Sequence, residues 1–306
     1  MPRFHRIAVL SLAAIFALVS IGGLVRATKS GLGCGDNWPD CPGDVDRALV
    51  IEMSHRGAAA VVVVLLATLA VVAWRRRHDA PGLVAPSVIA FALVLFQAVL
   101  GAFVVWLELR AESVVLHLGT AMALLVLLVY ITAATSVSAA SFVEATDARV
   151  ARRGRLVAAA ILLLLLAGSY VTGRDAGYVF GDWPLMNGQM VPDLSIETYA
   201  VHFLHRAMAG VVGILLFAFC VGIIRRKREL PLQARLAHVA AGAFAVEVLV
   251  GAANVWTRLN PAVVTLHLAL GALILASVAG IAIISKPEFA ASAARTSSLR
   301  IEPARV

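Results

Sequence analysis

Long runs of apolar residues alternate along the chain with short polar and charged segments. A helix needs about 20 mostly apolar residues to cross the hydrocarbon core of a bilayer, and eight runs are long enough. An open sheet edge could not satisfy its backbone polar groups in lipid, and the runs lack the alternation of barrel strands, so we predict helices. The expected spans are residues 7–25, 50–74, 83–107, 113–136, 156–172, 198–224, 236–257 and 261–285.

The amino-acid composition also indicates a membrane protein. Of the 306 residues, 61% are hydrophobic and 14% are charged, whereas soluble domains have about 45–50% apolar and about 25% charged residues. These values exclude a disordered chain and argue against an ordinary soluble domain. The net charge of +8 could indicate nucleic-acid binding. The basic residues lie at the ends of apolar runs, however, so we expect membrane topology and no nucleic-acid partner.

Basic residues gather in every second connecting segment, and this pattern predicts the orientation in the membrane. Cytoplasmic loops carry an excess of Lys and Arg. The opposite loops are longer and acidic. We therefore expect a multi-pass membrane protein with both termini in the cytoplasm. The basic residues on that side are Arg3, Arg6, Arg75, Arg76, Arg77, Arg149, Arg152, Arg153, Arg155, Arg225, Arg226, Lys227, Arg228, Arg235, Lys286, Arg295, Arg300 and Arg305.

The two halves of the chain repeat each other. His55-Arg56 recurs as His205-Arg206, and His117 recurs as His267 at the same offset. Each half has four spans, an even number, so both enter the membrane in the same sense, as in transporters with parallel repeats. We predict an all-α integral membrane protein of eight transmembrane helices. They would form two tandem four-helix bundles, residues 1–140 and 141–306, related by a pseudo-two-fold axis along the membrane normal.

The four repeated histidines are the strongest candidates for chemistry. His55 and His117 lie six and five residues inside the outer ends of their spans, which is a depth of roughly 8–9 Å. His205 and His267 have the same depth. An intramembrane histidine indicates function by default. Two imidazoles at one depth on neighbouring helices can bind one heme iron from both sides. No third or fourth ligand recurs, which argues against structural zinc.

An arginine follows the first histidine in each half. Arg56 and Arg206 could pair with heme propionates, because guanidinium groups bind carboxylates well. The alternative is that both side chains extend to the outer membrane interface.

The halves also differ, and the differences carry information. Glu52 lies three residues before His55 on one helix face, and its counterpart is His202. Glu52 could move protons or position a reacting group, or it could be an interfacial residue facing water. Gln97 corresponds to Glu247, an intramembrane carboxyl group that could take part in proton transfer or could be packed in its protonated form. These differences predict a catalytic N-terminal half and an electron-carrying C-terminal half.

A cysteine pair occurs only in the first half. Cys34 and Cys41 lie in the first external segment, where a disulfide is chemically favoured. It could be a structural link or a redox-active pair.

Taken together, the sequence resembles the heme A synthase family. The resemblance covers residues 7 to 284. It is carried by 22–34, Trp38-Pro39, Cys41, 52–56, 97–101, His117, His205-Arg206 and His267. It implies an eight-helix oxidoreductase that converts heme O to heme A for cytochrome oxidase. The C8 methyl group of heme O would become a formyl group through successive hydroxylations.

The resemblance also implies roles for individual residues. His55 and His117 would bind the substrate heme, and Glu52 would be essential to the chemistry. His205 and His267 would hold a heme b cofactor, with Cys34 and Cys41 marking the subtype with a disulfide. Expected partners are heme O, a heme O synthase, cytochrome oxidase assembly factors and the lipid bilayer. The electron donor and a homo-oligomeric state are left open.

Two other classes fit parts of the pattern. A non-catalytic bis-His diheme electron carrier would share the ligands. All four histidines lie near one face, however, which does not suit a relay across the membrane. A transporter with parallel repeats would show broken helices and a polar site at the midplane, and the sequence has neither. Transporters of that kind bind no heme, so bound heme separates them from the other two classes.

Overall fold

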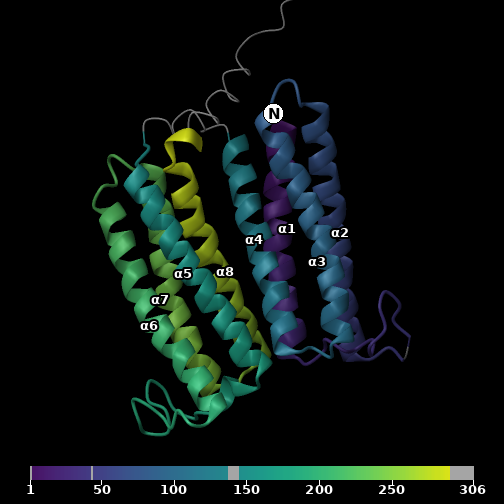
Figure 1. Ribbon diagram of the computed structural model, residues 1–306, viewed down its shortest axis with the longest axis vertical. Helices are drawn as coiled ribbons and strands as arrows, with labels where there is room; N and C mark the ends of the chain where they lie inside the picture. Colours follow the sequence, from purple (N-terminus) through teal and green to yellow (C-terminus); the bar gives the residue numbers. More distant parts are fainter. Residues whose placement is uncertain (1, 43, 137–144, 290–306) are drawn as a thin grey trace, which may run out of the picture.

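The structure is a computed structural model that describes residues 2–42, 44–136 and 145–289. Within these residues it is built from eight long helices, with long loops over residues 28–46 and 174–196 (Figure 1). All eight are long and apolar enough to cross a membrane, which confirms the predicted class. They are α1 (Pro2–Ala27), α2 (Arg47–Arg75), α3 (Val84–Trp106), α4 (Ala111–Thr135), α5 (Ala148–Gly173), α6 (Glu197–Ile224), α7 (Pro231–Trp256) and α8 (Pro261–Ile284).

Helix α5 departs most from its expected bounds. The apolar run begins at residue 156, but the helix begins at Ala148. Asp147 caps it, because its carboxylate accepts the backbone N–H groups of Arg149 and Val150 at 2.8 and 3.1 Å. A capped helix continues into water as readily as into lipid. Hydropathy therefore predicts the membrane-spanning part of this helix and not its start.

The helices pack in two groups of four, which Figure 1 shows side by side. In the first group α1 and α3 each contact both α2 and α4, and in the second α5 and α7 each contact both α6 and α8. The groups meet through α1, α4, α5 and α8. The predicted division at residues 140 and 141 falls outside the described residues. The pseudo-two-fold axis stays a prediction.

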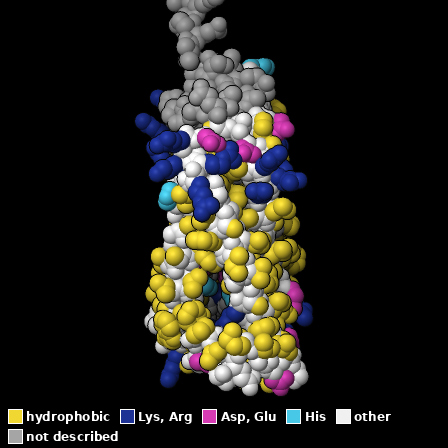
Figure 2. Space-filling model, turned by 90° about the vertical axis from the view of Figure 1, so that its left-hand side faces the viewer, with side chains coloured by type: hydrophobic (Ala, Val, Ile, Leu, Met, Phe, Trp, Pro, Cys, Tyr) yellow, Lys and Arg dark blue, Asp and Glu magenta, His cyan; other side chains and the backbone are white. Residues whose placement is uncertain are grey.

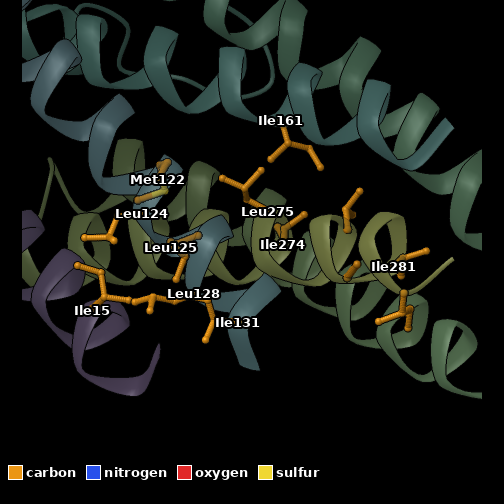
Figure 3. Close-up of a cluster of buried hydrophobic side chains, with 14 of the residues drawn as sticks. Ile15, Met122, Leu124, Leu125, Leu128, Ile131, Ile161, Ile274, Leu275 and Ile281 are labelled. Carbon is orange, nitrogen blue, oxygen red and sulfur yellow. The ribbon is translucent and has the colours of Figure 1, made fainter. Parts of the chain in front are cut away.

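Many of the buried hydrophobic side chains lie where the two groups meet. Figure 3 shows them converging from α1, α4, α5 and α8. Lipid is as apolar as leucine, so such helices are held together by close van der Waals packing rather than by the hydrophobic effect. This core fixes α4 and α8, the helices that carry His117 and His267. The labelled residues are Ile15, Met122, Leu124, Leu125, Leu128, Ile131, Ile161, Ile274, Leu275 and Ile281.

The backbone repeats itself as the sequence does. After α3, Glu108 and Leu109 take left-handed conformations with φ of 51° and 61°. After α7, Arg258 and Leu259 take the same conformations with φ of 52° and 62°. Residues other than glycine rarely adopt such angles, so their recurrence confirms that the repeat extends to the connections between helices.

Basic side chains are concentrated at one end of the molecule. Figure 2 shows a band of Lys and Arg at its upper end, above a broad hydrophobic surface. The N-terminus lies at the same end in Figure 1. By the positive-inside rule this end would be cytoplasmic, and we retain that orientation as a prediction.

Candidate functional site

Each of the four repeated histidines lies against a glycine of the neighbouring helix. At each glycine, a Cβ atom would lie close to Cε1 of the facing imidazole, so the absence of a side chain lets the ring approach the backbone. The distances are 3.2 Å for Gly22 and His55, 3.5 Å for Gly101 and His117, 2.9 Å for Gly168 and His205, and 3.4 Å for Gly251 and His267.

Nδ1 of each of these four rings is buried without a hydrogen-bond partner among the described residues. In the second half, Oε1 of Glu247 lies 3.1 Å from Nδ1 of His267. The Leu164 carbonyl lies toward the His205 ring but not in hydrogen-bonding geometry to Nδ1. Buried polar atoms normally have partners. Four histidines at repeated positions whose Nδ1 atoms have no hydrogen bond could therefore serve as ligands for a metal centre.

The histidines are grouped in the two predicted pairs. The imidazoles of His55 and His117 lie close enough to interact electrostatically, and so do those of His205 and His267. Figure 2 shows a hollow in the lower half of the face formed by the second group of helices, with histidine atoms visible inside hydrophobic walls. An apolar slot with two imidazoles is the setting that bis-His heme requires.

Glu52 is held in the first half by contacts from two elements, α2 and the loop that precedes it. It lies on α2 and is buried, with 4% of its surface exposed. The backbone N–H of Cys34 donates to its Oε2 at 2.9 Å, and Nη2 of Arg56 donates to its Oε1 at 2.5 Å. A charge-assisted pair of this kind is strong and directional. Glu52 is therefore not an interfacial residue facing water, and its orientation depends on the loop that carries Cys34.

That loop is fastened to α2 at several points. Cys34 and Cys41 form a disulfide, as the sequence predicts. A Cβ at Gly33 would lie 2.5 Å from the backbone of Ala48, so only glycine permits this approach. Arg56 also donates to the carbonyls of Asn37 and Pro39, at 3.1 and 3.0 Å. The loop thus presents the Cys34 amide to Glu52.

The second half uses the equivalent positions differently. Nδ1 of His202 donates to the Ala176 carbonyl at 2.7 Å, and its Nε2 accepts from Nε of Arg206 at 3.0 Å. Because arginine can only donate, this tautomer is fixed. Arg206 also donates to the carbonyls of Asp182 and Leu185. Both nitrogens of His202 are therefore committed, unlike Nδ1 of the four repeated histidines.

Arg56 and Arg206 share a role that the sequence did not predict. Both guanidinium groups bind carbonyls of the external segment that precedes their helix. Neither extends freely to the interface. Propionate binding by these residues remains a prediction.

A polar pocket between the two halves also escaped the sequence analysis. It has a volume of about 340 Å³, and Nη2 of Arg26 donates to the Thr172 carbonyl beside it at 3.0 Å. Its charges come from the ends of four helices, so no local motif indicates it. The charged lining residues are Arg26, Glu108, Arg110, Glu112, Arg174 and Asp175.

Comparison with known proteins identifies relatives of the chain. A sequence model of the family described as "Cytochrome oxidase assembly protein" matches residues 5–48 and 45–279. The heme A synthase of Shouchella clausii is 32% identical over 76% of this chain and 81% of its own length. That of Halalkalibacterium halodurans is 31% identical over 67% and 71%. That of Rhizorhabdus wittichii is 26% identical over 86% and 88%.

Proposed function

Because the chain belongs to the cytochrome oxidase assembly protein family, we propose that it is a heme A synthase of a bacterial membrane. Its substrate would be heme O, whose C8 methyl group would be oxidised to a formyl group. The observation that carries the proposal is the buried Glu52, one turn from His55, in only one of the two repeated histidine sites.

The N-terminal half would bind the substrate. His55 and His117 would ligate the iron of heme O from α2 and α4. Glu52 would hold or move a proton at its Oε1 or Oε2 atom, the two positions where Arg56 and the Cys34 amide now donate. The disulfide loop would keep these donors in place. An apolar, enclosed site excludes water from reactive groups.

The C-terminal half would hold a heme b through His205 and His267. When bound, heme b would supply one-electron transfer to the N-terminal site. The protein's own part would be to fix the two rings: Gly168 and Gly251 let them lie against α5 and α7. His202, with both nitrogens committed, would stay outside this ligand set and support Arg206.

Access to the substrate site would be from the bilayer. The isoprenoid tail of heme O is too apolar for water, and the outer surfaces of the helices carry many exposed apolar side chains. We place both sites toward the non-cytoplasmic face, opposite the band of Lys and Arg in Figure 2.

The test is mass spectrometry of hemes extracted from aerobic cells that make this protein together with a heme O synthase. Heme A or its hydroxylated precursor should accumulate with the unmodified chain and fall sharply with Glu52→Gln. Glu112→Gln, which removes an exposed carboxylate near the start of α4, serves as the matched control and should leave the yield unchanged.

The opposite outcome is equally informative. If the folded protein binds heme but the cells contain only heme B and heme O, it is a non-catalytic diheme electron carrier. A protein that purifies without any heme would contradict both functions.

A further inference from the structure

One intramembrane carboxyl group faces a proposed heme ligand. Glu247 on α7 places its Oε1 3.1 Å from Nδ1 of His267 on α8. The two atoms are close but lack the angle of a hydrogen bond. Its other oxygen, Oε2, is buried without a partner in the described residues. Glu247 is therefore held in the bundle with the His267 ring as its polar neighbour.

Gln97, the equivalent residue in the first half, forms its hydrogen bonds with groups other than the imidazole ring. Nε2 of Gln97 donates to the backbone carbonyl of His117 at 2.9 Å, and its Oε1 accepts from the hydroxyl of Thr120 at 2.5 Å. Gln97 therefore binds the backbone of the histidine and not its ring. The ring of His117 keeps a buried Nδ1 without a partner.

Two further sequence differences accompany this change. The position of Thr120 is occupied by Leu270 in the second half, so Glu247 has no hydroxyl there to bind. The position of Ala121 is occupied by Gly271, where a Cβ would lie 2.6 Å from Cδ2 of Leu165 and in ordinary contact, at 3.5 Å, with Oε1 of Glu247. The second half thus removes the competing donor.

We propose that Glu247 is a positioning residue for the C-terminal heme: it accepts the Nδ1–H of His267 and leaves Nε2 to ligate the iron. The inference rests on the proposed function, because it takes His267 to be a ligand. A carboxyl acceptor fixes the tautomer and orientation of a metal-bound histidine and makes the ring more basic. A more basic axial ligand stabilises the ferric state, so this heme is more reducing than it would be without Glu247.

A carboxyl group faces a ligand ring in one half only. The two hemes therefore have different surroundings, although each is held by two histidines. The heme ligated by His205 and His267 has the carboxyl-supported ring. The site of His55 and His117 has none, since Gln97 is bound to backbone and Thr120. The difference favours electron flow from the C-terminal site to the N-terminal site.

The experiment is a potentiometric titration of the full-length protein in detergent, followed by its heme absorption, with electron paramagnetic resonance of the ferric form. A His55→Ala background isolates the C-terminal heme, and the unmodified chain is titrated beside it. Glu247→Gln should raise the ferrous-to-ferric ratio at a fixed potential on the order of tenfold, which is 59 mV for a one-electron couple.

Two further variants separate charge from positioning. Glu247→Leu, which also removes the acceptor, should shift the ratio at least as far and broaden the resonance spectrum. Glu197→Gln removes a carboxylate of the same half that is paired with Arg174 instead, and it should leave the ratio unchanged.

The outcomes distinguish this inference from the function on which it rests. If both Glu247 variants keep a bis-His heme with an unchanged ratio and spectrum, Glu247 does not act on His267, and the heme assignment stands. If Glu197→Gln shifts the ratio as much as Glu247→Gln, the effect is general electrostatics and the inference is wrong. If His267→Ala keeps the bis-His spectrum of the C-terminal heme, the ligand assignment and the inference both fail.

Discussion

The outer ends of α2 and α6 share the same order of functional residues but differ in the chemical type of one of them. Each has a histidine with an uncommitted Nδ1, preceded by a buried polar residue and followed by an arginine that binds loop carbonyls. In the first half the buried residue is Glu52, whose carboxylate matches the charge of Arg56. In the second half it is His202, whose ring accepts from Arg206 without supplying an opposite charge. The comparison suggests that the ligand frame was duplicated and that reactivity depends on one position.

The loops above the two sites differ in the same way. The first is closed by the Cys34–Cys41 disulfide. The second contains no cysteine, and Asp182 organises it by accepting the backbone N–H groups of Asn187 and Gly188, both at 2.7 Å. The Gly188 amide above all holds the pKa of Asp182 below its usual range. A covalent link positions the Cys34 amide for Glu52, whereas the second loop needs only to receive Arg206.

The comparison depends first on the histidine pairs, and their removal has the largest expected effect. His205→Ala should abolish heme binding in the C-terminal half and leave the N-terminal half able to bind, because a bis-His site needs both ligands. Heme per polypeptide, measured as the pyridine complex, should fall to that of one site. His238→Ala, on α7 with Nδ1 close to the Ala234 carbonyl, is the control. Unchanged heme content in His205→Ala would contradict the assignment.

A substitution at Glu52 can give the first site the residue that the second site has at the equivalent position, His202. Glu52→His should lower heme A formation by about 100-fold or more, the scale expected for loss of a proton-transfer group. Heme binding should persist. The measurement is the heme A to heme O ratio in cells with a heme O synthase. The reciprocal His202→Glu should cost far less. Equal losses from both changes would show that the halves do not divide the roles as proposed.

Much of this arrangement is predictable from sequence, for physical reasons. Apolar runs must be helical in lipid, and an intramembrane histidine is costly enough to mark a site. The repeat then identifies which histidines belong together. Sequence also gives the cysteine pair, because only one pair lies in an external segment.

The contacts that orient Glu52 could not be predicted in the same way. The Cys34 amide and the carbonyls bound by Arg56 belong to a loop without periodicity, and backbone groups leave no mark in the residue types. Gly33 was the available signal, since a glycine permits the close approach to Ala48. Whether Glu247 and His267 face each other depends on how α7 packs on α8. The periodicity of either helix alone does not determine this packing.

The glycines behind the histidines give a graded test of the comparison. Gly168→Ala would place a Cβ 2.9 Å from the His205 ring, whereas Gly101→Ala would place one at 3.5 Å from the His117 ring, an ordinary contact. Overpacking of this kind costs about 1–3 kcal/mol. We expect heme affinity to fall on the order of tenfold in Gly168→Ala, less in Gly22→Ala and little in Gly101→Ala, measured by heme titration of the apoprotein. A reversed order would contradict the packing.

The smallest expected effect concerns the start of the second half. Asp147 caps α5 and accepts from Nη1 of Arg226 at 2.7 Å, while its backbone N–H donates to the Ser285 carbonyl, so it joins α5 to the ends of α6 and α8. Burial alone would raise the pKa of Asp147, but the hydrogen bonds from Arg226 and the amides of Val150 and Arg149 outweigh it and lower the pKa.

A carboxylate with a lowered pKa stabilises the fold above its unfolded pKa, and this contribution is lost as pH falls through the folded value. Asn keeps a capping oxygen but loses the charge, so Asp147→Asn should reduce the free energy of unfolding by up to about 1 kcal/mol at pH 7, the scale of a partly exposed ion pair. The gap to the unmodified chain should narrow below about pH 4. Thermal unfolding in detergent at both pH values measures the difference in stability between the variant and the unmodified chain. A difference that widens in acid would mean that Asp147 does not act through its charge.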